Sequence, residues 1–140
     1  MKRLLKSALL LMLALSLLLA FCACNQVSPE EKWKNATYPH DRSFGEGAIT
    51  IALEVKVEEN SVTFTVHTDE ENLADALLEH GIIEGESGEF GLYVKKVNGI
   101  TADYDVDGSW WNLQKNGVDT LGASSVTISD GEHYEFVYTK

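Results

Sequence analysis

The chain has 140 residues, in which 22 acidic residues outnumber 11 basic ones and give a formal net charge of −11 at neutral pH. This length suits a single domain behind an N-terminal leader. So acidic a surface disfavours binding to nucleic acid and to anionic lipid, and we therefore expect no nucleic-acid partner. The charge is compatible with cationic ligands, and it also favours solubility at a crowded, anionic cell surface.

Residues 1–23 have the layout of a secretory signal peptide. Basic residues open the chain, a mostly apolar run covers residues 4–20, and Ala23 stands directly before Cys24. A small residue before a cysteine resembles the bacterial lipobox, in which Cys24 is acylated on its sulfur and becomes the mature N-terminus. Phe21 departs from the usual Leu three positions before that cysteine. The alternative is an uncleaved anchor helix, for which the apolar run is short.

Removal of this leader changes the composition of what remains. Three of the 11 basic residues lie in the leader, so about 116 residues keep 8 basic and all 22 acidic ones, and the net charge falls to −14. The only cysteines are Cys22 and Cys24, so the mature domain has no disulfide, thiol nucleophile or thiolate metal site. We predict a lipid-anchored protein on the extracytoplasmic face of a bacterial cell membrane.

Residues 24–47 are predicted to form a flexible tether behind the lipid. The segment is polar, contains Pro29 and Pro39, and shows no sustained periodicity. A flexible chain of this length spans about 25 Å root-mean-square. We therefore expect the tether to hold a domain of residues 48–140 just above the membrane.

The domain is predicted to begin with a β-hairpin. Apolar and polar residues alternate over Ile49–Val57 and again over Val62–Val66, with a turn at Glu59–Asn60 between them. A period of two places one face of a strand in the core and the other in water.

A single helix is predicted after the hairpin. Thr68 and Glu71 have the spacing of a capping box, apolar residues recur at helical intervals from Leu73, and Gly81 suits a helix end. A helix of about 12 residues needs tertiary packing to persist. We expect it to lie across the apolar face of the hairpin.

Short strands and turns are predicted for the rest of the chain. The expected strands cover residues 92–97, 110–115, 126–128 and 134–138, and the turns are Asn98–Gly99, Asn116–Gly117 and Asp130–Gly131. This order, a hairpin and one helix followed by further short strands, predicts an α+β domain.

Several dispersed motifs occur in an order that resembles a known family. They are Glu71–Leu78, Gly91–Val94, Val97–Gly99, Ala102–Tyr104, Trp111, Asn116–Gly117, Gly122–Ala123, Asp130–Gly131 and Tyr134–Tyr138. The chain resembles a small bacterial lipoprotein domain of unassigned function that is similar to the C-terminal domain of transcobalamin and intrinsic factor. The resemblance covers nearly all of residues 49–138.

That resemblance implies a β-grasp-like α+β fold, with one helix packed on a mixed or antiparallel sheet, of the soluble-ligand-binding type. In the vertebrate carriers this domain covers one face of a corrinoid, and a second, helical domain supplies part of the pocket. We find no segment for that helical domain in these 140 residues. Fold alone does not establish function, so corrinoid binding is an expectation to be tested.

Two adjacent tryptophans provide the first candidate site. On a strand, Trp110 and Trp111 face opposite sides, and the resemblance favours Trp111 as the core residue. An exposed Trp110 beside Tyr104 can stack on a planar ligand or a sugar, unless both tryptophans pack in the core. Small residues nearby leave room for a flat ligand. The candidate ligand-binding residues are Tyr104, Trp110, Leu121, Gly122, Ala123 and Ser124.

The segment Asp103–Gly108 resembles the start of an EF-hand loop. Its weak candidate metal ligands, Asp103, Asp105 and Asp107, alternate as calcium ligands do. Gln114 stands where the bidentate Glu belongs, and the flanking segments are predicted strands rather than helices. An acidic loop without a metal is the favoured interpretation.

No motif in the sequence indicates catalysis. The chain has no G-x-S-x-G elbow, P-loop, G-x-G-x-x-G or H-E-x-x-H motif. We therefore predict a binding protein rather than an enzyme, without a cofactor. The first hypothesis is capture of a corrinoid or another planar soluble ligand for a membrane transporter. The second is a cell-surface interaction module that binds protein or envelope glycan.

Overall fold

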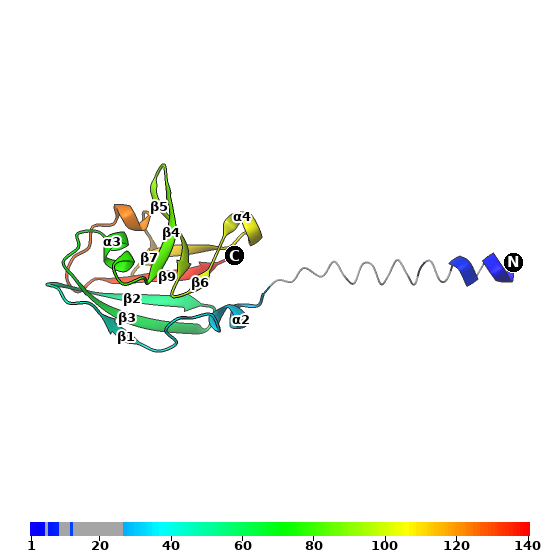
Figure 1. The fold of residues 1–140 in the computed structure, drawn as a ribbon, viewed down its shortest axis with the longest axis horizontal. Helices are drawn as coiled ribbons and strands as arrows, with labels where there is room; N and C mark the ends of the chain where they lie inside the picture. The colour runs from blue at the N-terminus through cyan, green and yellow to red at the C-terminus, as the bar shows by residue number, and fades with distance from the viewer. Residues whose placement is uncertain (5, 9–11, 13–26) are drawn as a thin grey trace.

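The computed structural model describes residues 1–4, 6–8, 12 and 27–140 (Figure 1). The predicted cleavage region and the lipidation site at Cys24 lie outside these residues. From Val27 onward the chain forms an α+β domain, in which a helix and a small sheet lie over one face of a large mixed sheet. None of the helices in the described ranges combines the length and the apolar character needed to cross a membrane.

The predicted hairpin is confirmed. It consists of β2 (Ile49–Val57) and β3 (Asn60–Thr68), which pair antiparallel along their full length. Alternate side chains of both strands are buried, including Leu53 and Phe64, because the period of two matches a sheet with one face on the core.

The large sheet joins this hairpin to the end of the chain. Its strand order is β1-β3-β2-β9-β7-β8, where β1 is Arg42–Phe44, β7 is Trp110–Lys115, β8 is Val118–Asp119 and β9 is His133–Thr139. The pairs β1–β3 and β2–β9 are parallel, whereas β2–β3, β7–β9 and β7–β8 are antiparallel. The α+β class with a mixed sheet is therefore confirmed.

The helix α3 (Leu73–Leu78) is shorter than predicted and begins later. Its N-cap is Asn72, whose side chain accepts a hydrogen bond from the backbone N–H of Asp75 at 2.9 Å. The predicted capping box at Thr68 is wrong, because Thr68 is the last residue of β3 and pairs with Ile49. Strand pairing thus overrides a local helix signal at this position.

A small second sheet follows the helix. It contains β4 (Ile83–Gly88), β5 (Gly91–Val97) and β6 (Ile100–Thr101), and the β4–β5 hairpin projects from the domain (Figure 1). One turn of helix, α4 (Tyr104–Asp107), leads into β7. The strand predicted at 126–128 is wrong, because this stretch follows a 3-10 turn, η1 (Ala123–Ser125), and makes only an isolated bridge at Thr127.

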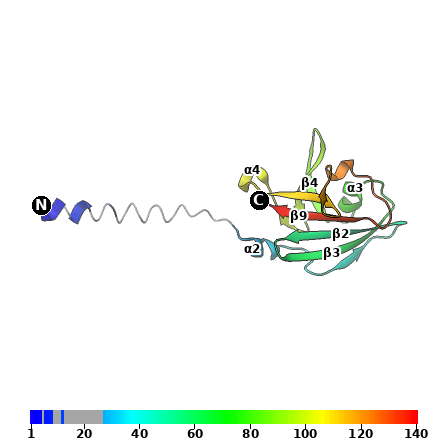
Figure 2. The same ribbon diagram turned by 180° about the vertical axis from the view of Figure 1, so that it is seen from behind.

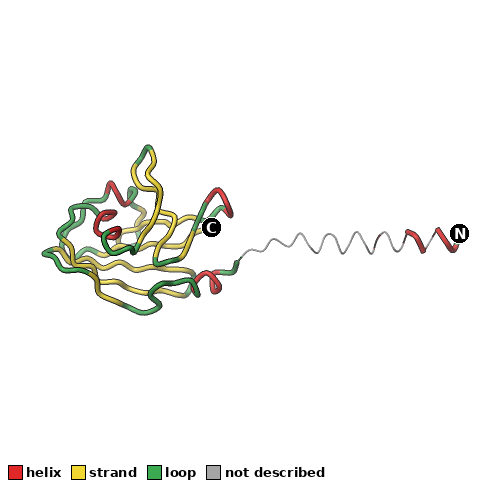
Figure 3. The backbone as a smooth tube through the Cα atoms, viewed as in Figure 1, coloured by secondary structure: helices red, strands yellow, loops and turns green. Residues whose placement is uncertain are grey.

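The predicted flexible tether is corrected for residues 28–44. A short helix, α2 (Pro29–Trp33), is capped by Ser28, and β1 pairs in parallel with β3 (Figure 3). The ring of Phe44 lies 5.2 Å from that of Tyr38 and 5.3 Å from that of Phe64. These elements are too short to show a periodic pattern, so they were not predicted from the sequence. They nevertheless belong to the folded domain.

We expect Leu77→Ala to lower the free energy of unfolding by about 2–5 kcal/mol, because the Leu77 side chain is fully buried on the inner face of α3. The neighbouring Leu78 is exposed, so Leu78→Ala is a matched control that should change stability by only about 0.5 kcal/mol. Urea denaturation followed by circular dichroism measures both. Equal, small effects would contradict the packing of α3 on the sheet.

Candidate functional site

The two adjacent tryptophans point to opposite sides of β7. Trp111 has only 6% of its surface exposed, and its indole N–H donates to the carbonyl of Ile100 at 3.0 Å. Trp110 is 37% exposed at the start of the strand. The prediction that Trp111 is the core residue and Trp110 the surface one is confirmed.

Tyr104 lies beside Trp110, as the sequence analysis expected. The two ring centroids are 6.1 Å apart in an edge-to-face arrangement, and Tyr104 is well exposed at the start of α4. Edge-to-face pairs of this kind are favourable contacts between aromatic rings. The pair therefore presents aromatic surface to the outside while each ring supports the other.

Two further side chains, which were not predicted from the sequence, are linked to this pair through Asp103. On β5, Tyr93 is exposed and the ammonium of Lys95 lies 5.8 Å from the centre of its ring. The same ammonium lies 3.5 Å from the carboxylate of Asp103, the residue before Tyr104. The signal was present in the sequence, because Tyr93 and Lys95 alternate with buried Val94. We call Tyr93, Lys95, Tyr104 and Trp110 the aromatic corner.

Hydrogen bonds within the loop fix the position of α4. Asp103 caps the helix by accepting from the N–H of Asp105 at 3.1 Å, and Gly108 ends it with a φ of +75°. Asp107 accepts from both the hydroxyl and the backbone N–H of Ser109. These bonds, together with Lys32 3.5 Å away, hold the pKa of Asp107 below its ordinary range.

Asp103 and Asp107, two of the weak candidate metal ligands, stabilise the loop through hydrogen bonds and ion pairs. Asp103 and Asp107 are turned toward the helix cap, toward Ser109 and toward lysines. Over residues 1–4, 6–8, 12 and 27–140, no three side chains of His, Cys, Asp or Glu converge where they could hold a metal ion. The loop geometry is that of a capped helical turn rather than that of an ion-binding loop.

The predicted turn at residues 121–124 is divided between surface and core. Leu121 is exposed, and a side chain at Gly122 would meet open space. Ala123 is buried, and the hydroxyl of Ser124 accepts from the N–H of Leu92 at 3.0 Å. Ser124 is itself exposed while its hydroxyl attaches the turn to β5, so Ala123 is the residue of this turn that is withdrawn from the surface.

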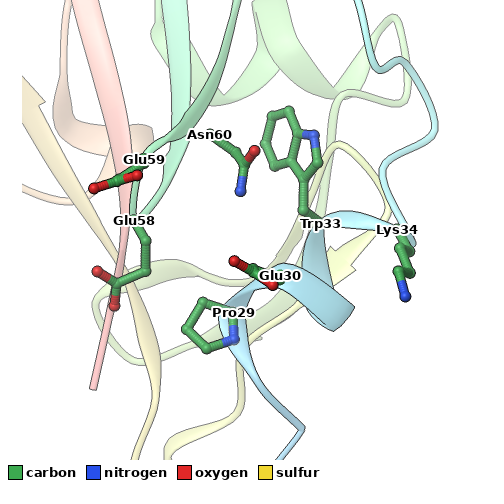
Figure 4. Close-up of a pocket in the computed structure, with 7 residues that line it drawn as sticks. All are labelled: Pro29, Glu30, Trp33, Lys34, Glu58, Glu59 and Asn60. Atoms are coloured by element: carbon green, nitrogen blue, oxygen red, sulfur yellow. The ribbon is translucent and has the colours of Figure 1, made fainter.

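Three surface hollows lie elsewhere on the domain. One of about 690 Å³ is lined by Pro29, Glu30, Trp33, Lys34, Glu58, Glu59 and Asn60 (Figure 4). The others, of about 390 and 220 Å³, adjoin residues 96–101 and residues 38–42. None of the three is lined by Trp110 or by residues 121–124. The aromatic corner is thus an outward surface separate from these hollows.

Comparison with known proteins supports the fold. No family model and no curated protein matches the chain. A crystal structure from Ruminococcus gnavus ATCC 29149, of a protein provisionally named metal-binding, matches 66% of this chain and 98% of its own, with a TM-score of 0.63 and 29% identity. Haptocorrin in complex with Cbi matches 69% of this chain, with a TM-score of 0.51 and 24% identity.

The match covers only 26% of haptocorrin, so this chain corresponds to a part of that protein. Haptocorrin is a member of the transcobalamin family, so the predicted resemblance to that family is supported at the level of the fold.

We expect the stability of the α4 loop to fall on acidification. The folded pKa of Asp107 lies below its ordinary value of 3.8, so its stabilising effect is present above that value and is lost as the pH falls through the folded pKa. Asp107→Asn should remove about 1 kcal/mol at neutral pH and flatten this acid dependence.

Asp105→Asn, in the same turn, is the control, because no hydrogen bond involves the Asp105 side chain among the described contacts. Denaturant titrations from neutral to acidic pH compare the variants. An Asp107→Asn protein with the stability and pH profile of the control would contradict this role of Asp107.

Proposed function

We propose that this protein is a lipid-anchored, extracytoplasmic domain that binds a planar soluble ligand, such as a corrinoid, and serves a membrane transporter. The observation that carries the proposal is the outward-facing Tyr104–Trp110 pair at a ring distance of 6.1 Å. Support comes from a fold shared with part of haptocorrin, whose structure holds Cbi. The lipobox-like sequence at Cys24 supports the anchor.

The chemistry of the aromatic corner suits a flat ligand with polar groups at its rim. The rings of Trp110 and Tyr104 offer apolar contact, and the tyrosine hydroxyls can donate hydrogen bonds at the edge. An outward surface covers only one side of such a ligand. We infer that a partner protein supplies the opposite side, as the second domain does in the vertebrate carriers.

Binding rather than catalysis is the role that these side chains favour. Lys95 and Asp103 form an ion pair at 3.5 Å, and Asp107 is held by Ser109 and Lys32. The charged groups are therefore engaged in structure, and we propose no reaction for the site.

A β-grasp-like fold is also proposed, supported by β9 lying in parallel beside the first strand of the N-terminal hairpin.

A cell-surface interaction module is the second candidate function. It is favoured by the position of Trp110 outside the three hollows, because exposed aromatic residues on an open surface also suit protein or glycan partners. The two candidates differ in whether a small molecule binds the isolated domain at all.

We expect cobinamide to bind weakly and Trp110→Ala to weaken the binding about 2- to 10-fold, since a stacked aromatic contributes about 0.5–1.5 kcal/mol. Equilibrium dialysis is the suitable measurement, because the absorbance of the ligand reports binding independently of the removed indole. Leu78→Ala, which removes an exposed apolar side chain on α3, is the control and should leave the affinity unchanged.

Absence of saturable binding by any corrinoid up to millimolar concentration would eliminate this class of ligand. The interaction module would then be the better account of the aromatic corner. An unchanged affinity in Trp110→Ala would instead show that the ligand binds away from the corner.

The anchor is tested separately. Cys24→Ala should move the mature protein from the membrane fraction to the soluble fraction, or leave an unprocessed precursor, because the cysteine sulfur is the atom that would carry the lipid. Cell fractionation and mass spectrometry of the N-terminal peptide measure this. An unlipidated N-terminus at another residue of the wild-type protein would contradict the lipoprotein assignment.

A further inference from the structure

The folded domain begins very close to the proposed lipid anchor. The N-cap of α2 is Ser28, which follows Cys24 by four residues. Four residues span at most about 14 Å when fully extended. The inference below rests on the anchor proposed above. With that anchor in the bilayer, the end of the domain that carries α2 must face the membrane at short range.

The helix α4 lies at the same end of the domain as α2, and both views show the two above and below the C-terminus at that end (Figures 1 and 2). A side-chain contact connects them, because the ammonium of Lys32 in α2 is 3.5 Å from the carboxylate of Asp107 in α4. The same ammonium lies 5.0 Å from the centre of the Tyr138 ring near the end of β9. Lys32 of α2 thus contacts both α4 and β9.

Apolar side chains at this end face outward. Val106, in the middle of α4, is 81% exposed, and Val27, the residue before the α2 cap, is also exposed. Aliphatic side chains on a surface fixed near a bilayer are suited to the boundary between headgroups and acyl chains. Tyr104, also on α4, is of the residue type that concentrates at that level.

We propose that the α4 end of the domain docks on the surface of the phospholipid bilayer, with Val106 and Val27 in contact with the headgroup region. The aromatic corner then opens beside the membrane surface. The mature charge of −14, and Asp105 and Asp107 on α4 itself, make a zwitterionic surface the fitting one.

The chain offers a clean pair of positions for testing this contact. Its only cysteines are Cys22, in the leader, and Cys24, whose thiol is acylated, so an introduced cysteine is the only free thiol. Phe90 is 90% exposed at the turn of the projecting β4–β5 hairpin, away from α2 (Figure 1). Val106→Cys is therefore the test position and Phe90→Cys the matched control.

The lipidated full-length product of each variant carries an environment-sensitive fluorophore and is reconstituted in phosphatidylcholine vesicles. We expect blue-shifted emission and quenching by spin-labelled lipid at position 106, and water-like emission without quenching at position 90. Replacing part of the lipid by phosphatidylglycerol should reduce the quenching at 106, and added salt should restore it, since the Debye length is about 10 Å at 0.1 M salt.

Water-like emission at both positions, in protein whose Cys24 lipid is confirmed by mass spectrometry, would overturn the docking while leaving the anchor intact. Equal quenching at 106 and 90 would also overturn it, because the domain would then touch the bilayer without a fixed orientation. An unmodified Cys24 with protein free of the vesicles would remove the anchor, and the docking with it, so the two failures are distinguishable.

Discussion

The parallel pairing of β2 with β9 is the contact on which the rest of the domain depends. It runs from Ala52 opposite His133 to Lys56 opposite Val137, and Lys56 forms an ion pair with Glu135 at 2.6 Å across it. Parallel neighbours cannot be joined by a tight turn, so the chain between them has to cross over the sheet. That crossover contains α3 and the small sheet, which explains why these elements share one face of the large sheet.

The position of β9 beside β2 also determines where the aromatic corner lies in the fold. β9 also pairs with β7, and Trp110 stands opposite Thr139, the last residue of β9. The start of β7 is therefore held at the end of the large sheet, and α4 directly precedes it in the chain. Lys32 then joins this corner to α2 through Asp107. The geometry of the candidate site thus depends on long-range contacts as much as on its own loop.

The sequence predicted those features that leave a repeating local signal. The β2–β3 hairpin follows from alternation over many residues, and the opposite facing of Trp110 and Trp111 follows from strand geometry. The start of α3 was missed because pairing of Thr68 with Ile49 outweighs its capping signal. β1 is too short for a period to appear, and its parallel pairing with β3 has no local signature. Alternation around Val94 places Tyr93 and Lys95 on the outer side of β5, but the approach of Lys95 to Asp103 comes from the tertiary fold.

The structured N-terminal segment changes what a one-sided binding surface can do. A long flexible tether would let the domain search a volume above the membrane, whereas α2 and β1 bring the fold to within a few residues of Cys24. With the proposed lipid at Cys24, a domain on so short a connection would sample positions close to the bilayer surface. An open aromatic face on such a domain is completed most readily by a partner that is itself in the membrane or bound to it. Under the function proposed above, this constraint favours a membrane-embedded transporter over a soluble carrier as the protein that supplies the second side of the site.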